Sequence, residues 1–147
     1  MVIRNYTPSY KSDCLTIFDS NVPQLFTSNE RSEFEHWLDY HAKHQFYLIT
    51  EKEETVACGG IYTNYNSGTA GLVWGMVSSK HYGKSYGQAL TTYRLQKLLE
   101  HAAGYHSMKI SASLYTSEYY KKCGLRQVGI KKDGLAPGLD RYDFLIP

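Results

Sequence analysis

The residues best suited to chemistry lie in one stretch, residues 76–90, where an apolar segment leads into a short polar loop and then into a long helical pattern. The first N–H groups of a helix have no intrahelical partner, and the helix dipole adds partial positive charge beside them. Gly83 and Gly87 let a ligand come close to the backbone, because no Cβ stands in the way. Lys84 adds a mobile charge. The stretch therefore predicts an anion-binding site.

The glycine spacing of this loop excludes two common nucleotide motifs. The run Tyr82-Gly-Lys-Ser-Tyr-Gly87 differs from the dinucleotide fingerprint in its glycine spacing, and no acidic residue follows at the right distance. It also differs from the phosphate loop of nucleotide hydrolases, which ends in Lys-Ser/Thr after a distant first glycine. On these residues alone, an ordinary strand-to-helix turn stays open as the alternative.

Composition and charge limit the class of protein. The chain has 147 residues, of which 42% are hydrophobic and 20% charged, as expected for a single folded domain over residues 1–147. The formal net charge is +2 and the basic residues are scattered, which predicts no nucleic-acid partner. We find neither a signal peptide nor an apolar run as long as a membrane span, and expect a cytoplasmic protein without a membrane partner.

Neither the cysteines nor the histidines have the spacing of metal ligands. We expect Cys14, Cys58 and Cys123 to be buried thiols in a reducing cytoplasm. Among the histidines of residues 36–44, only His41 is expected on the apolar face of its helix, and no carboxylate or thiolate cluster completes a site. The sequence therefore predicts no metal.

Hydrophobic periodicity and turn signals predict the element order βααβββαβαββ. A capping box at Thr27 and Glu30 begins the second helix, and Gly104 and Gly124 end the third and fourth. The segment 133–138 is expected to be a loop. This order predicts an α+β (mixed α/β) fold, with a central mixed, mostly antiparallel sheet of about seven strands flanked by helices. The predicted strands are residues 2–6, 46–50, 55–63, 69–77, 109–114, 127–131 and 141–146, and the predicted helices begin near residues 8, 28, 85 and 117.

This order, together with two motifs, resembles the GCN5-related N-acetyltransferase (GNAT) family over nearly the whole chain. The family's acetyl-CoA loop follows the pattern Gln/Arg-x-x-Gly-x-Gly/Ala after a strand that usually ends in Val, and here Val77 precedes residues 82–87. The run Tyr120-Lys-Lys-Cys-Gly124-Leu125 is similar to the Tyr-x-x-x-Gly-Phe run that follows the family's fifth strand. Two loop positions depart from the pattern: Tyr82 replaces Gln/Arg, and Ser85 replaces a glycine.

The resemblance implies a GNAT-like acyl-CoA N-acyltransferase fold and an N-acetyltransferase that moves an acetyl group from acetyl-CoA to a primary amine, by direct attack on the thioester. Backbone groups of Met76 and Val77 would pair with the pantetheine arm. Tyr120 would protonate the departing thiolate; the alternative is a core tyrosine that closes its short helix. The remaining residues that would bind the cofactor are Tyr82, Gly83, Lys84, Ser85, Tyr86, Gly87 and Gln88.

The sequence says less about the general base and the acceptor than about the cofactor site. Alignment from the loop puts Gly71 where some family members have a glutamate. The alternatives are His81, Tyr115, Glu118, a water relay or an amine that arrives neutral. The resemblance places the acceptor, a small-molecule or peptide amine, near Phe26, Tyr62 and His81, with Leu25, Tyr65 and residues 133–140 close by.

Two other function classes stay open. One is a non-catalytic acyl-CoA-binding regulatory module with the same fold, which the departures at Tyr82, Ser85 and Gly71 would suit. The other is an unrelated α+β protein whose loop is an ordinary turn. The alternation of Tyr142, Phe144 and Ile146 in the last predicted strand permits a homodimer.

Overall fold

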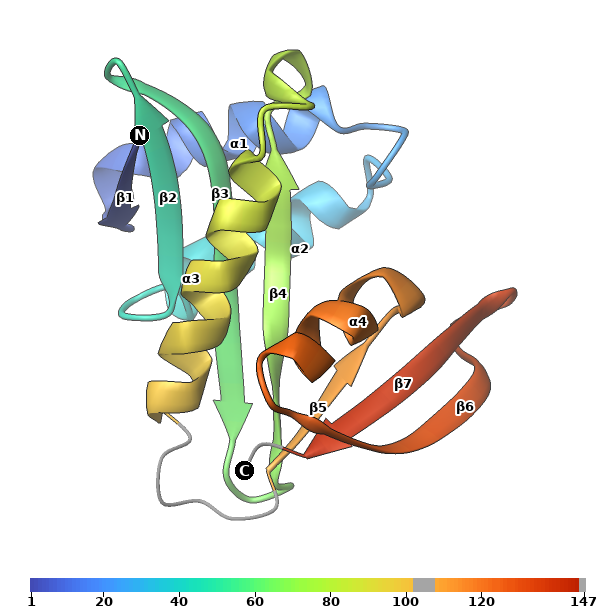
Figure 1. Ribbon diagram of the computed structural model, residues 1–147. Coiled ribbons are helices and arrows are strands. Elements are labelled where there is room, and N and C mark those ends of the chain that lie inside the picture. The colour runs from blue at the N-terminus through green and yellow to red at the C-terminus, as the bar shows by residue number, and fades with distance from the viewer. Residues whose placement is uncertain (102–107, 146–147) are drawn as a thin grey trace. The chain divides into compact units, whose positions relative to one another are not determined.

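The computed structural model describes residues 1–101 and 108–145 (Figure 1). The element order βααβββαβαββ is confirmed, with two short 3₁₀ helices added at Pro8–Tyr10 and Ser79–His81. The α-helices are α1 (Lys11–Ser20), α2 (Glu30–Tyr40), α3 (Tyr86–His101) and α4 (Leu114–Lys122). The strands are β1 (Val2–Asn5), β2 (Phe46–Glu51), β3 (Glu54–Asn64), β4 (Thr69–Val77), β5 (Lys109–Ala112), β6 (Arg126–Ala136) and β7 (Leu139–Leu145).

The strands form one seven-stranded sheet in the order β1-β2-β3-β4-β5-β7-β6. β1 and β3 pair antiparallel with β2, and β5 and β6 pair antiparallel with β7. β4 and β5 pair in parallel at Thr69↔Lys109 and Ala70↔Ile110. A parallel pair needs a long crossover connection, which α3 supplies. The predicted α+β class with a mixed, mostly antiparallel sheet is confirmed.

The chain forms two compact units, which we describe separately. Unit 1 consists of Met1–Ile61 and Leu72–Gln96, and unit 2 of Tyr62–Gly71 and Lys97–Pro147. The expectation of a single domain over residues 1–147 stays a prediction.

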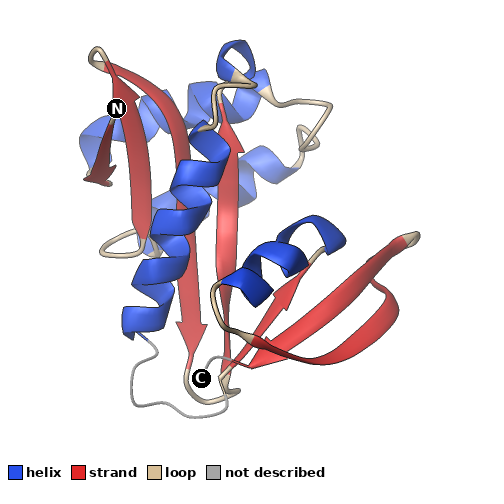
Figure 2. Cartoon of the chain, viewed as in Figure 1, coloured by secondary structure: helices blue, strands red, loops and turns tan. Residues whose placement is uncertain are grey.

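In unit 1, helices cover both faces of the sheet: α1 and α2 lie on one face and α3 on the other (Figure 2). Successive side chains of β2 point to opposite faces, as the period of a strand requires. Phe46 and Leu48 join the core under α1 and α2, whereas the Tyr47 ring packs on Tyr93 of α3 at 5.2 Å. This two-sided burial explains why almost every residue of β2 is buried.

The second helix differs from its prediction at both ends. The Thr27 N–H donates to the Glu30 carboxylate at 3.2 Å, which is one half of the predicted capping box, but the helix begins only at Glu30. At the other end, the prediction that His41 shares the apolar face is wrong. His41 follows the last helical residue and is exposed, while Ala42 takes the buried position.

In unit 2, the predicted loop 133–138 is wrong, because β6 continues to Ala136 and turns directly into β7. The Asp133 N–H donates to Asp140 Oδ1 at 3.0 Å, and Asp133 Oδ1 accepts the Gly138 N–H at 2.8 Å. These bonds hold residues 133–140 in an irregular hairpin. Glycine and aspartate favoured the loop prediction, and here they make the irregularities of a strand.

Helix α4 begins earlier than predicted. The Ser113 N–H donates to Thr116 Oγ1 at 3.1 Å, and the Ser117 N–H to the Ser113 carbonyl at 2.9 Å, so a Ser-x-x-Thr cap at Ser113 opens the helix. Gly124 ends the helix with a φ of +89°, as predicted. The expected helix end at Gly104 and the strand residue Ile146 lie outside the described residues.

The cysteine prediction is partly correct. Cys14 and Cys58 are buried in the core of unit 1, but Cys123 is exposed. Burial raises the pKa of the Cys58 thiol well above its ordinary value, which keeps that thiol protonated and unreactive. Within residues 1–101 and 108–145, no helix has the length and apolar character to cross a membrane. The same part of the chain holds no metal-competent group of three His, Cys, Asp or Glu side chains.

Candidate active site

The loop between β4 and α3 has an open, irregular backbone. Gly83 and Ser85 both have positive φ, at +78° and +65°. A Cβ built on Gly83 would meet no atom within 4 Å, and one built on Gly87 would be 3.5 Å from Val77 Cγ2. The protein itself therefore leaves space over both predicted glycines. This space lies beside the N-terminus of α3, where the unpaired N–H groups favour an anion.

A hollow of about 310 Å³ lies in this loop. Lys84 and Gln88, which we also predicted to bind the cofactor, are exposed and do not line it. His81 packs its ring edge-on to Tyr86, with centroids 6.2 Å apart, and its Nε2 lies 3.6 Å from a Glu54 carboxylate oxygen. The residues that line the hollow are Val77, His81, Tyr82, Gly83, Ser85, Tyr86 and Gly87.

A second, larger groove of about 400 Å³ follows the C-terminal part of β4 and one face of α3. Val77, Tyr82 and Gly87 line both the groove and the hollow, so the two spaces adjoin. The groove also contains Met76, as the predicted pantetheine site requires. Its other lining residues are Asn21, Gln24, Leu25, Gly75, Leu90, Thr91 and Arg94.

Asn21 is a site residue that sequence reasoning missed. Its side chain is fully buried, and its Nδ2 donates to the carbonyls of Val77 and Ile17, both at 2.9 Å. The Tyr82 hydroxyl donates to Asn21 Oδ1. Tyr82, which replaces the family's Gln or Arg, therefore ties the loop to the end of α1 through a neutral hydrogen bond. The only signal in the sequence was a polar residue at a predicted helix end.

The middle of β4 is irregular at Trp74, whose φ is +53°. For a bulky residue this conformation costs on the order of 1–3 kcal/mol, and it is typical of a β-bulge. The Trp74 ring lies in the core beside Phe34, with centroids 5.1 Å apart, and beside Phe26 at 5.8 Å. Tertiary packing thus stabilises the irregular conformation at Trp74, which we call the kink of β4. The groove begins with the next residue, Gly75.

The residues predicted for the acceptor and the base have different environments. Phe26 stacks on Phe18 with ring centroids 4.8 Å apart, so its ring is largely a core group. Tyr62, in unit 2, is 40% exposed and covers Gly71. A Cβ on Gly71 would lie 2.5 Å from Tyr62 Cε1. The Tyr62 ring therefore occupies the space that a side chain at position 71 would need.

Tyr120, the predicted acid, lies in unit 2 with only 2% of its surface exposed. Its ring packs edge-on to Phe144 of β7 with centroids 5.6 Å apart, and its carbonyl accepts the N–H groups of Cys123 and Leu125. These contacts suit a core tyrosine at the end of α4, and they hold the position of its ring. Both interpretations of Tyr120 stay open.

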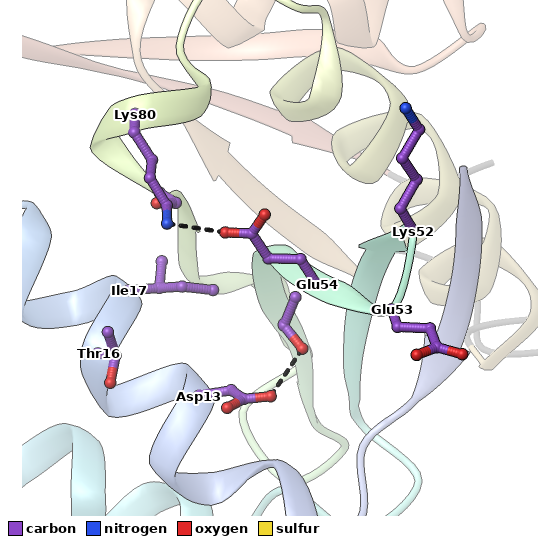
Figure 3. A pocket seen from close by; sticks show the side chains of 9 residues that line it. Asp13, Thr16, Ile17, Lys52, Glu53, Glu54 and Lys80 are labelled. Carbon is purple, nitrogen blue, oxygen red and sulfur yellow. Dashed lines mark hydrogen bonds and ion pairs between the residues drawn. The ribbon is translucent and has the colours of Figure 1, made fainter.

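A third hollow, of about 380 Å³, lies between α1, the β2–β3 hairpin and the 3₁₀ helix after β4 (Figure 3). Three of its charged groups, Lys80, Glu54 and Asp13, already have partners within the hollow. Lys80 Nζ lies 2.9 Å from the Glu54 carboxylate, and Thr55 Oγ1 donates to Asp13 at 2.9 Å. Nothing in this arrangement points to a ligand.

We expect Ser85→Gly to stabilise the protein by about 0.5–1 kcal/mol. Serine at a φ of +65° is strained, whereas glycine adopts this conformation without a steric penalty. The gain is reduced because glycine also has more freedom in the unfolded chain. Chemical denaturation of both proteins measures the difference. Gly138→Ser, which places serine at a φ of +79° in the β6–β7 turn, is the reverse control and should lower the stability. A less stable Ser85→Gly protein would contradict the prediction.

A strand that ends in a glycine-containing loop, a 16-residue helix after it and a groove along that strand are the features that the resemblance to the acyl-CoA N-acyltransferase fold predicts. The family model of the GNAT acetyltransferases matches residues 13–125. The chain belongs to the GNAT family, whose acetyltransferases are enzymes. No curated protein matches the chain in a sequence search.

Solved structures agree on the fold. The ribosomal-protein-alanine N-acetyltransferase from Brucella melitensis superimposes with a TM-score of 0.71 at 15% identity, over 99% of this chain and 98% of that chain. A GNAT-family acetyltransferase from Bacillus cereus gives 0.66 at 15% identity, over 98% and 94%. An aminoglycoside 6′-N-acetyltransferase complexed with coenzyme A gives 0.67 at 15% identity, over 100% and 98%.

Proposed function

We propose that this chain is an acetyl-CoA-dependent N-acetyltransferase that acts on a primary amine of a small molecule or peptide. The observation that carries the proposal is the open hollow at the N-terminus of α3, which adjoins a groove along β4. Family membership supports the reaction class, and the coenzyme A complex of one structural neighbour supports the cofactor.

The chain has groups suited to each part of acetyl-CoA. The N–H groups from Gly83 to Gln88 would hold the pyrophosphate, because Gly83 and Gly87 leave the space beside the helix start free of side-chain atoms. The backbone at Met76 would pair with the amide-rich pantetheine arm. The Ser78 N–H already donates to the Val56 carbonyl at 2.8 Å, so we assign the N–H of Val77 or of its other neighbour, Met76, to the thioester carbonyl.

Acetyl-CoA supplies a thioester whose acetyl carbon is open to attack by the acceptor nitrogen. The new C–N bond forms as the C–S bond breaks, and the departing sulfur needs a proton. Tyr120 donates that proton in our proposal, because a positioned phenol O–H can act as the general acid for a departing thiolate. The attacking amine loses a proton to water, or to His81 if the acceptor binds beside it.

Two structural neighbours are named for the acceptors that they modify, ribosomal-protein alanine and aminoglycosides. These are the first candidates for the acceptor class of this chain. We place the reaction in the cytoplasm, where free thiols such as Cys14 and Cys58 persist. The non-catalytic alternative is favoured by one observation: the Tyr62 ring covers Gly71, so no carboxylate base can project from that position.

The test is thermal unfolding with acetyl-CoA, coenzyme A and ATP, followed by turnover on a panel of amines. A ligand that binds only the native state adds roughly 2.7 kcal/mol at a hundredfold excess over its dissociation constant. We expect stabilisation by both CoA species, none by ATP, and free thiol released with at least one amine. Stabilisation without turnover on any amine would favour the regulatory module. No stabilisation by any CoA species would refute the proposal.

A further inference from the structure

Arg94 is a charged residue in the apolar stripe of α3. It is 6% exposed and lies one turn from Leu90 and one turn from Leu98, both fully buried. A buried charge is costly unless its hydrogen bonds are satisfied, so a leucine would be the simpler choice at this position. The guanidinium spans two strands instead. Its Nη1 donates to the Gly60 carbonyl of β3 at 3.3 Å and to the Val73 carbonyl of β4 at 3.4 Å.

Two glycines make the space that this guanidinium occupies. A Cβ on Gly59 would lie 2.9 Å from Arg94 Cζ and Nη1, and a Cβ on Gly75 would lie 2.5 Å from Nη2. Any other residue at either position would force the guanidinium to move. Both strands are therefore shaped to receive Arg94.

Arg94 approaches β4 on both sides of its irregular residue, Trp74. The Val73 carbonyl directly precedes Trp74, whose φ is +53°, and Gly75 directly follows it. Gly75, Met76 and Val77 then line the groove together with Arg94 itself. The guanidinium thus holds the kinked backbone from the α3 face, while the Trp74 ring holds it from the core under α1 and α2.

We propose that Arg94 is a positioning residue for acyl transfer, which keeps the backbone of residues 73–77 in the kinked form that polarises the thioester carbonyl. The reaction named in this proposal rests on the proposed function. The role of Arg94 at the kink rests only on the contacts of this chain. Arg94 also places a fixed positive charge beside the groove, which favours the negative charge that develops on the carbonyl oxygen.

The test compares Arg94→Met, which keeps the stem but removes the donors and the charge, with Leu98→Met, a buried change on the same helix that touches neither carbonyl. The first measurement is amide hydrogen exchange of the ligand-free proteins. We expect Arg94→Met to speed exchange at residues 74–77 at least tenfold and to leave β2 unchanged. We expect Leu98→Met to leave exchange at both places unchanged. Equal effects at β2 and β4 would reduce Arg94 to a general stabilising residue and overturn the proposal.

The second measurement is steady-state kinetics. We expect Arg94→Met to lower kcat about tenfold and to change the KM for acetyl-CoA less than threefold, because the polarising contact strengthens in the transition state. Gly59→Ala keeps the arginine but displaces it, so it should lower kcat in the same direction if Arg94→Met does not fold. Parent kcat in a folded Arg94→Met protein would overturn the proposal. An inactive parent would refute the proposed function instead, and the exchange data would still decide whether Arg94 holds the kink.

Discussion

Tyr120→Phe should lower kcat for acetyl transfer about 100-fold while the dissociation constant of acetyl-CoA changes less than twofold. A positioned general acid contributes on the order of 10²–10⁴ in rate, and water that replaces it recovers part of this. The ring itself should stay in place, because phenylalanine keeps the aromatic ring that packs edge-on with Phe144. Cofactor affinity should hold, because the loop residues that we assign to the cofactor lie elsewhere in the chain.

The control for Tyr120→Phe is Tyr93→Phe, which removes a hydroxyl from a half-buried ring of α3 and keeps the contact with Tyr47. We expect the control to keep parent kcat. Loss of a buried hydroxyl's hydrogen bond costs about 1 kcal/mol, so both variants should also be compared by denaturation. A Tyr120→Phe protein that is less stable but equally fast would assign Tyr120 to the core alone, and the acid would have to be sought elsewhere.

Element order could be predicted from this sequence because hydrophobic periodicity and turn residues agree along most of the chain. The predicted element order and sheet type are confirmed. Both ends of β4 and the end of α4 at Gly124 also lie where expected. The errors arose where a local signal was ambiguous. Asp133 and Gly138 favour a loop as strongly as they favour an irregular hairpin, and only the bonds to Asp140 and Gly138 decide between them.

The loop residues of the candidate site were predictable because their chemistry is local: glycine, a helix start and a preceding strand are all read from neighbouring positions. Asn21, Trp74 and Arg94 were not predictable, because their roles depend on contacts between distant segments. The Asn21–Val77 bond joins residues 56 positions apart, and Arg94 reaches Gly60 across 34. An arginine among leucines on a helix and two glycines in two strands were each visible, but nothing in the sequence indicates that they meet.

Gly87→Ala is the most direct test of the cofactor site. The added methyl group would lie 3.5 Å from Val77 Cγ2, an ordinary contact, so the ligand-free protein should accept it. Alanine near a helix start should even stabilise the chain, by up to about 1 kcal/mol relative to glycine. The methyl group nevertheless enters the hollow in which we place the pyrophosphate. Fold and cofactor binding should therefore change in opposite directions.

We expect Gly87→Ala to raise the dissociation constant of acetyl-CoA about 30-fold, because displacing a phosphate from a charge-assisted N–H bond costs roughly 2 kcal/mol. Isothermal titration of coenzyme A measures the affinity, and denaturation without ligand measures the stability. Gly129→Ala in β6, where a Cβ meets no atom within 4 Å, is the control and should leave affinity unchanged. Parent affinity in Gly87→Ala would place the pyrophosphate away from the N-terminus of α3. A loss of affinity with a gain in stability would mean that position 87 is kept free of a side chain for the ligand and not for the fold.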